Sequence, residues 1–263
     1  MAEPLLSIRG LSKRFGGLLA SDRIDLDVTR GETHAIIGPN GAGKTTLIGQ
    51  LAGDLRPDAG SIRFADQDVT RLGAPHRARR GLARSFQVTS IFRDFSALDN
   101  VAFAVQAHRG SSFRFWRPAR SEPALRGPAR VALESVGLGG RADVRAANLA
   151  HGEQRQLEIA MALATEPRLL LLDEPVAGMG LDESQRMVRF LSTLKRRITI
   201  VLVEHDMDAV FTLADRISVM VYGRIIATGT PPEIRGHDEV RRAYLGEDQA
   251  CCSPSMRSRP RTV

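Results

Sequence analysis

The sequence predicts an α/β fold, in which a parallel β-sheet is covered by helices and interrupted by a mostly helical segment. Two apolar runs, Leu169–Leu172 and Ile198–Val203, lack the alternation of a half-exposed strand, which is typical of strands buried on both faces of a parallel sheet. A third strand, Thr33–Ile37, runs into a glycine-rich turn and then a helical pattern. From about Ile91 to Ala164 the pattern is helical, broken from Arg109 to Pro128 by Pro, Gly, Ser and Arg.

The other predicted elements follow from local patterns on either side of this segment. After Gly246 the composition turns to Cys, Ser, Pro and Arg, which predicts a disordered tail. The remaining elements, in chain order, are strands at Leu5–Ile8 and Ile24–Val28, a helix at Lys44–Ala52, a strand at Ser61–Phe64, a helix at Glu183–Arg197, and a hairpin whose strands Ile217–Val221 and Ile225–Ala227 flank a Tyr-Gly-Arg turn.

Composition excludes several classes of protein. Of 263 residues, 43% are hydrophobic and 25% charged, which is typical of one large or two small globular domains and excludes a disordered chain, a collagen or a coiled coil. No apolar run approaches the roughly 18 residues that span a bilayer, and no leader peptide is recognised after Met1. The two cysteines, Cys251 and Cys252, are adjacent, so we expect a reduced, cytoplasmic chain.

The charge balance is basic, at +7 from 37 Lys and Arg against 30 Asp and Glu. Such a balance is compatible with nucleic-acid binding or with an anionic membrane surface. The basic residues are spread along the chain, with excesses at Arg77–Arg84 and Met256–Arg261, and the aromatic residues do not interleave with them. Because the stacking platform for bases is missing, we expect no nucleic-acid partner.

One segment has the spacing of a phosphate-binding loop, G-x-x-x-x-G-K-[ST]. Its glycines let successive N–H groups point at phosphate oxygens, and the helix that follows adds its positive end. We expect the Lys44 ammonium to reach the β and γ phosphates and the Thr45 hydroxyl to hold Mg²⁺. A turn that only needed glycines would not explain Lys44 or Thr45. The predicted loop consists of Gly38, Pro39, Asn40, Gly41, Ala42, Gly43, Lys44, Thr45 and Thr46.

Two carboxylates, Asp173 and Glu174, end the apolar run that starts at Leu169. The carboxyl edge of a parallel sheet is where ligands bind in such folds. We expect Asp173 to take Mg²⁺, directly or through water, and Glu174 to orient or deprotonate the attacking water. Taken alone, the pair would also suit a turn with solvated acids, but the phosphate loop upstream favours a catalytic role.

A third motif, Leu149–Ala160, reads as a tight turn that enters a helix, whose N-terminus could meet another anion. Taken alone, it fits a capped structural helix better than a binding site. In this order, the three motifs resemble the ATP-binding subunits of ABC transporters, from about Leu5 to Asp248. The resemblance implies a P-loop NTPase core of the RecA-like type, with an antiparallel β subdomain and an inserted helical subdomain. It also implies that two subunits enclose two ATP molecules, each signature turn closing over the partner's γ-phosphate.

The resemblance assigns further roles. It implies that Phe15 stacks on adenine, that Gln87 reaches Mg²⁺ and water and senses the permease, and that His205 contacts the γ-phosphate. The residues alone would also fit a core or turn aromatic, a surface polar residue and a structural histidine. Ala177–Gly180 matches a loop that communicates across the dimer. The implied signature turn consists of Leu149, Ala150, His151, Gly152 and Glu153.

The motifs depart from the family pattern, which has Leu-Ser-Gly-Gly-Gln at the signature. Ala150 lacks the hydroxyl that commonly binds the γ-phosphate, and His151 and Glu153 replace Gly and Gln. We expect weakened binding, since Gly152 and the helix dipole remain. Gly180 stands where Asp or Asn is usual, so we expect altered coupling across the dimer.

These departures, with Arg242–Glu247, resemble the branched-chain amino-acid importer group. The sequence is thus interpreted as an ATPase that powers an importer of hydrophobic amino acids, coupled to permeases and indirectly to a binding protein outside the membrane. The permeases would hold it at the inner face of the membrane, with their contact around Val88–Asn100. A urea or amide importer, an exporter, or a soluble ATPase of the same family acting on nucleic acid or ribosomes remain alternatives. The expected division is 1–88 and 160–248 for the core, 89–159 for the helical subdomain and 249–263 for a basic tail.

Overall fold

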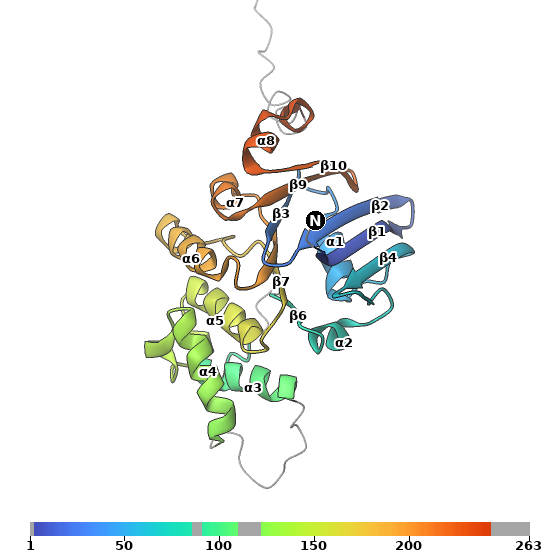
Figure 1. Ribbon diagram of the computed structural model, residues 1–263. Helices are drawn as coiled ribbons and strands as arrows, with labels where there is room; N and C mark the ends of the chain where they lie inside the picture. The colour runs from blue at the N-terminus through green and yellow to red at the C-terminus, as the bar shows by residue number, and fades with distance from the viewer. Residues whose placement is uncertain (1–2, 86–90, 110–121, 243–263) are drawn as a thin grey trace, which may run out of the picture.

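A computed structural model of the chain describes residues 3–85, 91–109 and 122–242, and its elements form two sheets flanked by helices (Figure 1). The central sheet has the strand order β10-β9-β3-β8-β7-β6. Neighbouring strands from β9 to β6 run parallel, and β10 pairs antiparallel with β9. Its strands are β3 (Thr33–Ile37), β6 (Leu82–Arg84), β7 (Leu169–Asp173), β8 (Thr199–Val203), β9 (Arg216–Val221) and β10 (Arg224–Gly229).

Alternate side chains of β7 and β8 enter different hydrophobic cores on the two faces of this sheet. Leu170 and Leu172 pack in the core that includes the inserted helices, while Leu169 and Leu171 pack in the core beneath the second sheet. All five residues of β7 and of β8 are buried. The prediction of strands covered on both faces is therefore confirmed.

The second sheet is antiparallel, with the order β2-β1-β4-β5. Its strands are β1 (Pro4–Phe15), β2 (Leu18–Thr29), β4 (Ala59–Phe64) and β5 (Gln67–Asp68). The helix α1 (Lys44–Ala52) shares a core with this sheet and the central one. Strand β1 continues seven residues beyond the predicted Leu5–Ile8 segment. After Gly10 the strand continues through Leu11, which is fully buried, and three polar residues that break the alternating pattern, and it pairs with β2 as far as Phe15.

Where the structure describes the inserted segment, its α-helices are α3 (Ala97–Arg109), α4 (Pro123–Ser135) and α5 (His151–Leu163). Short 3-10 turns lie at Gly139–Arg141 and Ala146–Asn148. The predicted break in the helical pattern, from Arg109 to Pro128, is wrong at its C-terminal end, because α4 already begins at Pro123. A proline fits the first position of a helix, since the N–H that it lacks would have no partner there. Pro128 cannot bond the Ala124 carbonyl, and the Arg109 guanidinium donates to that oxygen instead, at 2.7 Å.

The other helices surround the central sheet. In Figure 1, α6 and α7 lie on the side opposite the antiparallel sheet, α8 lies beyond β10, and α3 to α5 form the far end. The predicted helix Glu183–Arg197 is shifted: it begins at Leu181 and ends at Leu194, because Arg196 has a positive φ of 64°. The predicted hairpin of β9 and β10 is confirmed. The surrounding helices are α2 (Ala74–Ala78), α6 (Leu181–Leu194), α7 (Met207–Leu213) and α8 (Pro231–Gly236).

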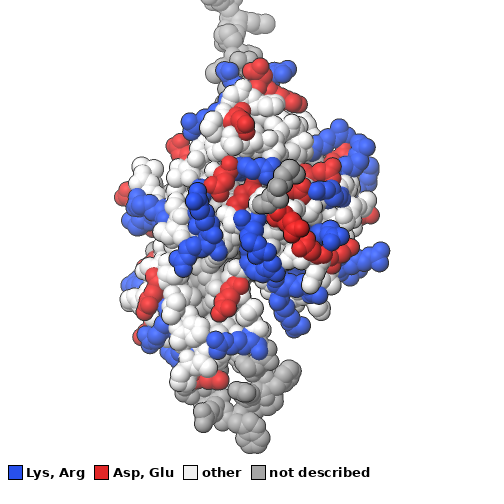
Figure 2. Space-filling view, in the orientation of Figure 1, with Lys and Arg blue, Asp and Glu red and all other residues white. Residues whose placement is uncertain are grey.

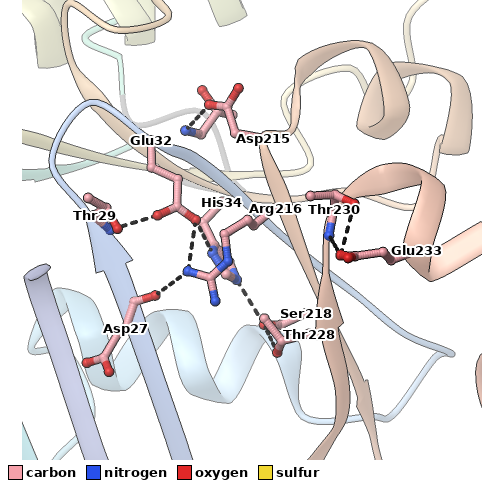
Figure 3. Close-up of polar contacts among 11 residues, drawn as sticks. Asp27, Thr29, Glu32, His34, Asp215, Arg216, Ser218, Thr228, Thr230 and Glu233 are labelled. Carbon is pink, nitrogen blue, oxygen red and sulfur yellow. Dashed lines mark hydrogen bonds and ion pairs between the residues drawn. The ribbon is translucent and has the colours of Figure 1, made fainter. Parts of the chain in front are cut away.

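A buried polar network joins β3 to β9 and β10 at the end away from the phosphate loop (Figure 3). The His34 ring bonds Glu32 Oε1 through Nδ1 and Ser218 Oγ through Nε2, each at 2.8 Å. Ser218 in turn bonds Thr228 at 2.7 Å. Since Glu32, His34 and Ser218 are all buried, the network satisfies polar groups that would otherwise be costly inside the sheet.

Within the described residues, no helix is long and apolar enough to cross a bilayer. Basic and acidic side chains are interspersed over the face drawn in Figure 2. This mixture agrees with the even distribution of charge along the sequence.

Candidate functional site

The predicted phosphate loop connects the carboxyl end of β3 to α1. The loop packs so closely that a Cβ at Gly38 would lie 2.0 Å from the Met220 carbonyl oxygen, and one at Gly43 would lie 2.1 Å from that of Ala20. Gly43 also has a left-handed φ of 102°. Glycine is therefore required here by close backbone approach as well as by the turn.

Lys44, the first residue of α1, is only 9% exposed. Its ammonium donates to the carbonyl oxygens of Gly38 at 2.6 Å and Pro39 at 2.9 Å, which curls the side chain over its own loop. Burial lowers the pKa of Lys44, while the negative charges of Glu174 and Asp173 oppose this change. The lysine therefore lies in the field of both the predicted magnesium ligand, Asp173, and the predicted catalytic residue, Glu174.

The other loop residues differ in their exposure. Ala42 is buried and its carbonyl accepts from the Gly223 N–H at 2.9 Å, which ties the loop to the hairpin of β9 and β10. Asn40 and Gly41 are exposed, and Thr46 is half-buried. Thr45 is exposed in the first turn of α1, so its side chain is accessible at the end of the helix where anions bind.

Asp173 lies at the end of β7, next to the loop, and is 1% exposed. Arg84 from β6 joins it to Asp54, with 3.3 Å from Nη2 to Asp173 and 2.6 Å from Nη1 to Asp54. Burial raises the pKa of Asp173, although the charge of Arg84 opposes this. Among the described residues, none donates a hydrogen bond to Asp173 Oδ1, which is fully buried.

This buried oxygen fits a magnesium site. Mg²⁺ prefers oxygen ligands and is usually held by one or two carboxylates together with substrate phosphates. Over the described ranges, no cluster of three or more His, Cys, Asp and Glu residues could bind a metal by itself. A magnesium ion at Asp173 would therefore take further ligands from hydroxyl or phosphate oxygens.

Glu174 follows with a left-handed backbone, at φ 50°. Such a conformation costs a non-glycine residue about 1–3 kcal/mol and is common at functional sites. Its N–H donates to the carbonyl of Val203, the last residue of β8, at 2.8 Å. The neighbouring strand therefore holds this residue in its strained conformation.

His205 follows β8 and comes close to Glu174. Its side chain is 63% exposed, and Nδ1 lies 3.8 Å both from Glu174 Oε1 and from Glu204 Oε2. Because β3, β8 and β7 are parallel neighbours, their carboxyl ends bring together Lys44, His205, Asp173 and Glu174. These four residues come from three segments that are far apart in the sequence.

The predicted signature turn forms the N-terminus of α5. Ala150 is the N-cap, and its N–H donates to Glu153 Oε2 at 2.9 Å. His151 is exposed, whereas Gly152 is buried, and a Cβ on Gly152 would lie 3.3–3.5 Å from the carboxylate of Glu183. Glu153 thus supplies one half of a capping box, and the other half is missing because Ala150 has no side-chain oxygen to accept from the first turn of α5.

Two predicted residues remain to be placed. Phe15 ends β1, is 46% exposed, and has the Lys13 ammonium 5.5 Å from its ring centroid. An exposed ring at this position is available for stacking. Gln87 lies outside the described residues.

Sequence reasoning missed two residues of the site, Arg84 and Glu204. Arg84 belongs to a basic stretch, Arg77–Arg84, that looks like a solvated surface in the sequence. Glu204 precedes His205, but nothing in the pattern indicates that its carboxylate is buried. Both are recognised only once the ends of β6, β7 and β8 lie side by side.

The comparisons with known proteins agree with this geometry. The family model described as ABC transporter matches residues 21–177, and a model described as branched-chain amino acid ATP-binding cassette transporter matches residues 224–250. The chain is 40% identical over 256 residues to the Escherichia coli high-affinity branched-chain amino acid transport ATP-binding protein LivG, covering 94% of this chain and 100% of the relative. The Pseudomonas aeruginosa protein BraF, which carries the same description, is 39% identical over 254 residues, with the same coverage of both chains.

Solved structures show the same architecture. The ADP conformation of an ATP-binding cassette of an ABC transporter is 28% identical, with a TM-score of 0.82, and covers 93% of this chain and 100% of its own. A nucleotide-free cassette from an ABC transporter has a TM-score of 0.80 at 27% identity, covering 92% of this chain and 98% of its own. The fold, the phosphate loop and the relatives together identify this chain as a member of the ATP-binding subunits of ABC transporters, which hydrolyse ATP and dimerise beside permease subunits.

Proposed function

We propose that this subunit powers an importer of branched-chain or other hydrophobic amino acids. One observation carries the catalytic part of the proposal: Lys44, Asp173, Glu174 and His205 meet at one edge of the sheet. The names of the relatives and the match of the C-terminal model at residues 224–250 support the substrate class. The transported solute itself would bind to permeases and a binding protein, which are separate chains.

In this proposal, residues 38–46 bind the phosphates of ATP. The backbone N–H groups and the N-terminus of α1 attract the phosphate oxygens. When ATP binds, the Lys44 ammonium donates to phosphate oxygens in place of the Gly38 and Pro39 carbonyls. The exchange is favourable because a hydrogen bond between two opposite charges is stronger than one to a neutral carbonyl. The exposed ring of Phe15 stacks on the adenine.

Magnesium would be held by Thr45, Gln87 and Asp173, and the ion would neutralise charge on the phosphates. Asp173 is suited to this role, since its Oδ1 has no hydrogen bond from any described residue. Arg84 keeps the other oxygen of the carboxylate, Oδ2, in place.

Glu174 would accept a proton from the attacking water, or orient it, and His205 would contact the γ-phosphate. The 3.8 Å between His205 Nδ1 and Glu174 Oε1 places the two side chains beside one another at this point. Charge that develops on the phosphate is then stabilised by Lys44 and His205.

The signature turn, Leu149–Glu153, would close over ATP bound by a partner subunit, either a second copy or a sister ATPase. Its Ala150 offers no hydroxyl, so the contact would depend on the N-terminus of α5 and on Gly152. The helical subdomain, 89–159, carries this turn, and the core, 1–88 and 160–248, carries the phosphate loop. Closure of the dimer on ATP would move the attached permeases, and hydrolysis would reopen it.

Two apolar surfaces of the described residues suit a permease. They include Ser85 and Phe92, which lie in the sequence on either side of residues 86–90. The ring centroids of Phe92, Phe95 and Phe103 lie 5.4–5.7 Å apart, and Phe92 and Phe103 are 54% and 42% exposed. A pocket of about 330 Å³, lined mainly by apolar atoms, includes Ser85 and Met161 and lies among α2, β6 and α5. Contact there would hold the subunit against the inner face of the membrane.

A direct test of the site is the variant Glu174→Gln, which keeps the shape of the side chain and removes its basicity. We expect it to bind ATP, to lose hydrolysis and to accumulate dimers in size-exclusion chromatography. Hydrolysis at the wild-type rate would overturn the assignment of Glu174.

Affinity capture from native membranes tests the transport role. Permeases and an amino-acid-binding protein should co-purify with the wild-type chain, and Met161→Glu should reduce their recovery without loss of folded protein. A urea-binding protein, export permeases alone, or ribosomes and nucleic acid would each favour the corresponding alternative function over this one.

A further inference from the structure

Glu204 is a buried carboxylate in the site for which the catalytic scheme has no role. It follows β8 directly and is 1% exposed. Oε1 accepts a hydrogen bond from the Val176 N–H at 2.9 Å, and Oε2 accepts one from the His205 N–H at 3.0 Å. A longer contact of 3.5 Å joins Oε2 to the Asp206 N–H.

These contacts join two segments that contain the predicted catalytic groups. Val176 lies two residues after Glu174, in the turn that leaves β7, and His205 begins the segment after β8. A second bond between the same segments is the 2.8 Å contact from the Glu174 N–H to the Val203 carbonyl. The end of β8 thus holds the turn at two points, the N–H of Glu174, which has a left-handed backbone, and the N–H of Val176.

The surroundings of Glu204 argue against a direct chemical role. The carboxylate is too buried to reach water, and backbone N–H groups occupy both of its oxygens. Burial raises its pKa, while the three backbone N–H groups oppose this rise. A carboxylate in these surroundings is a fixed acceptor. If the side chain moved, the backbone N–H groups of Val176 and His205 would lose their hydrogen-bond acceptor.

We propose that Glu204 is a positioning residue for ATP hydrolysis, which fixes Glu174 and His205 relative to one another across the ends of β7 and β8. The inference rests on the proposed roles of those two residues. It predicts a specific kinetic signature. The phosphate loop makes no use of Glu204, so the variant should bind ATP normally and fail in the chemical step.

The variant Glu204→Gln tests this with little change of volume. A glutamine offers one acceptor oxygen and one NH₂ donor, so either the Val176 or the His205 N–H loses its acceptor, whichever way the amide turns. The matched control is Glu32→Gln. Glu32 is also a buried carboxylate beside a histidine, accepting from the Thr29 N–H at 2.8 Å (Figure 3). It directly precedes β3, however, and so lies at the opposite end of the parallel strands.

The measurements are kcat and KM for ATP, ATP affinity by titration, and the melting temperature, on the full-length chain. We expect Glu204→Gln to lower kcat roughly 10- to 100-fold, because small misplacements of catalytic groups have effects of this size. ATP affinity and KM should stay near wild type. Glu32→Gln should melt at a lower temperature and keep its kcat.

The outcomes separate this inference from the proposed function. If the wild type hydrolyses ATP and Glu174→Gln stalls, but Glu204→Gln keeps the kcat of the control, Glu204 has no positioning role. A loss of ATP affinity in proportion to activity would equally refute the inference, since it would indicate a general structural defect. If instead Glu174→Gln hydrolyses ATP like the wild type, the catalytic assignment itself fails, and the inference with it.

Discussion

Arg77 is a fully buried arginine whose guanidinium holds the end of the helix that follows the phosphate loop. It is 1% exposed and donates to the carbonyl oxygens of Gln50 at 2.6 Å and Leu51 at 2.7 Å, in the last turn of α1. Further bonds reach the carbonyls of Leu72 at 2.8 Å and Thr70 at 3.1 Å. We expect Arg77→Met, which keeps an unbranched stem but removes the guanidinium, to destabilise the protein.

Two effects oppose one another in this substitution. A buried carbonyl that loses its donor costs about 1–3 kcal/mol. The bonds to Gln50 and Leu51 are buried and those to Leu72 and Thr70 are half-buried. At about 2 kcal/mol for each of the first two and about 1 kcal/mol for each of the others, the four acceptors together contribute about 6 kcal/mol. Burial lowers the pKa of Arg77 to about 10. The shift corresponds to about 3 kcal/mol against the charged form, which is regained when the charge is removed. The loss of hydrogen bonds is the larger effect, so the substitution should lower the free energy of unfolding by about 3 kcal/mol.

The melting temperature measures this difference. For a chain of this size, about 3 kcal/mol corresponds to a decrease of roughly 6–12 °C. Arg79→Met is the control, because Arg79 lies in the same stretch with its side chain exposed. If Arg77→Met melts with the control or above it, the carbonyls find other partners and the buried guanidinium is a net cost.

Two further variants test the loop and the distal network. Lys44→Ala should lose most of its affinity for ATP, because the mobile positive charge at the phosphates is removed; an unchanged affinity in calorimetric titration would refute the role of Lys44. Burial is the largest single effect on the pKa of Glu32 and raises it, but the hydrogen bonds from His34 and Thr29 and the charges of His34 and Arg216 together bring this pKa below its ordinary value of 4.5. A lowered carboxylate pKa stabilises the fold above 4.5, and this contribution disappears as pH falls through the folded-state pKa. Urea titration measures the free energy of unfolding of wild type and of Glu32→Gln. The difference between them should have its largest value at pH 7 and decrease below pH 4.5.

The features that could be predicted from the sequence have local signals. An apolar run without alternation indicates a doubly buried strand wherever it occurs, so β7 and β8 were predicted within a residue or two of their ends. The phosphate loop is defined by the spacing of a few residues, and its helix begins at Lys44 as predicted. The carboxylates of Asp173 and Glu174 were recognised because a strand ends at them.

The features that were missed depend on contacts between distant segments. Arg77 is buried among backbone carbonyls, and an arginine in a basic stretch gives no sign of this in the sequence. The same is true of Glu204, whose partner Val176 lies on another strand end. The start of α4 was placed too late, because Pro128 would break an ordinary helix and Arg109 compensates from a different helix.

This last contact has a practical consequence. The hydrogen bond from Arg109 to the Ala124 carbonyl fastens α3 to α4 at the two borders of residues 110–121. Because lengthening the connection between two fastened ends costs little additional entropy, we expect the chain to tolerate residues inserted between Arg109 and Glu122. A fluorescent peptide placed there would tag the subunit for single-molecule work while leaving its nucleotide pocket as it is.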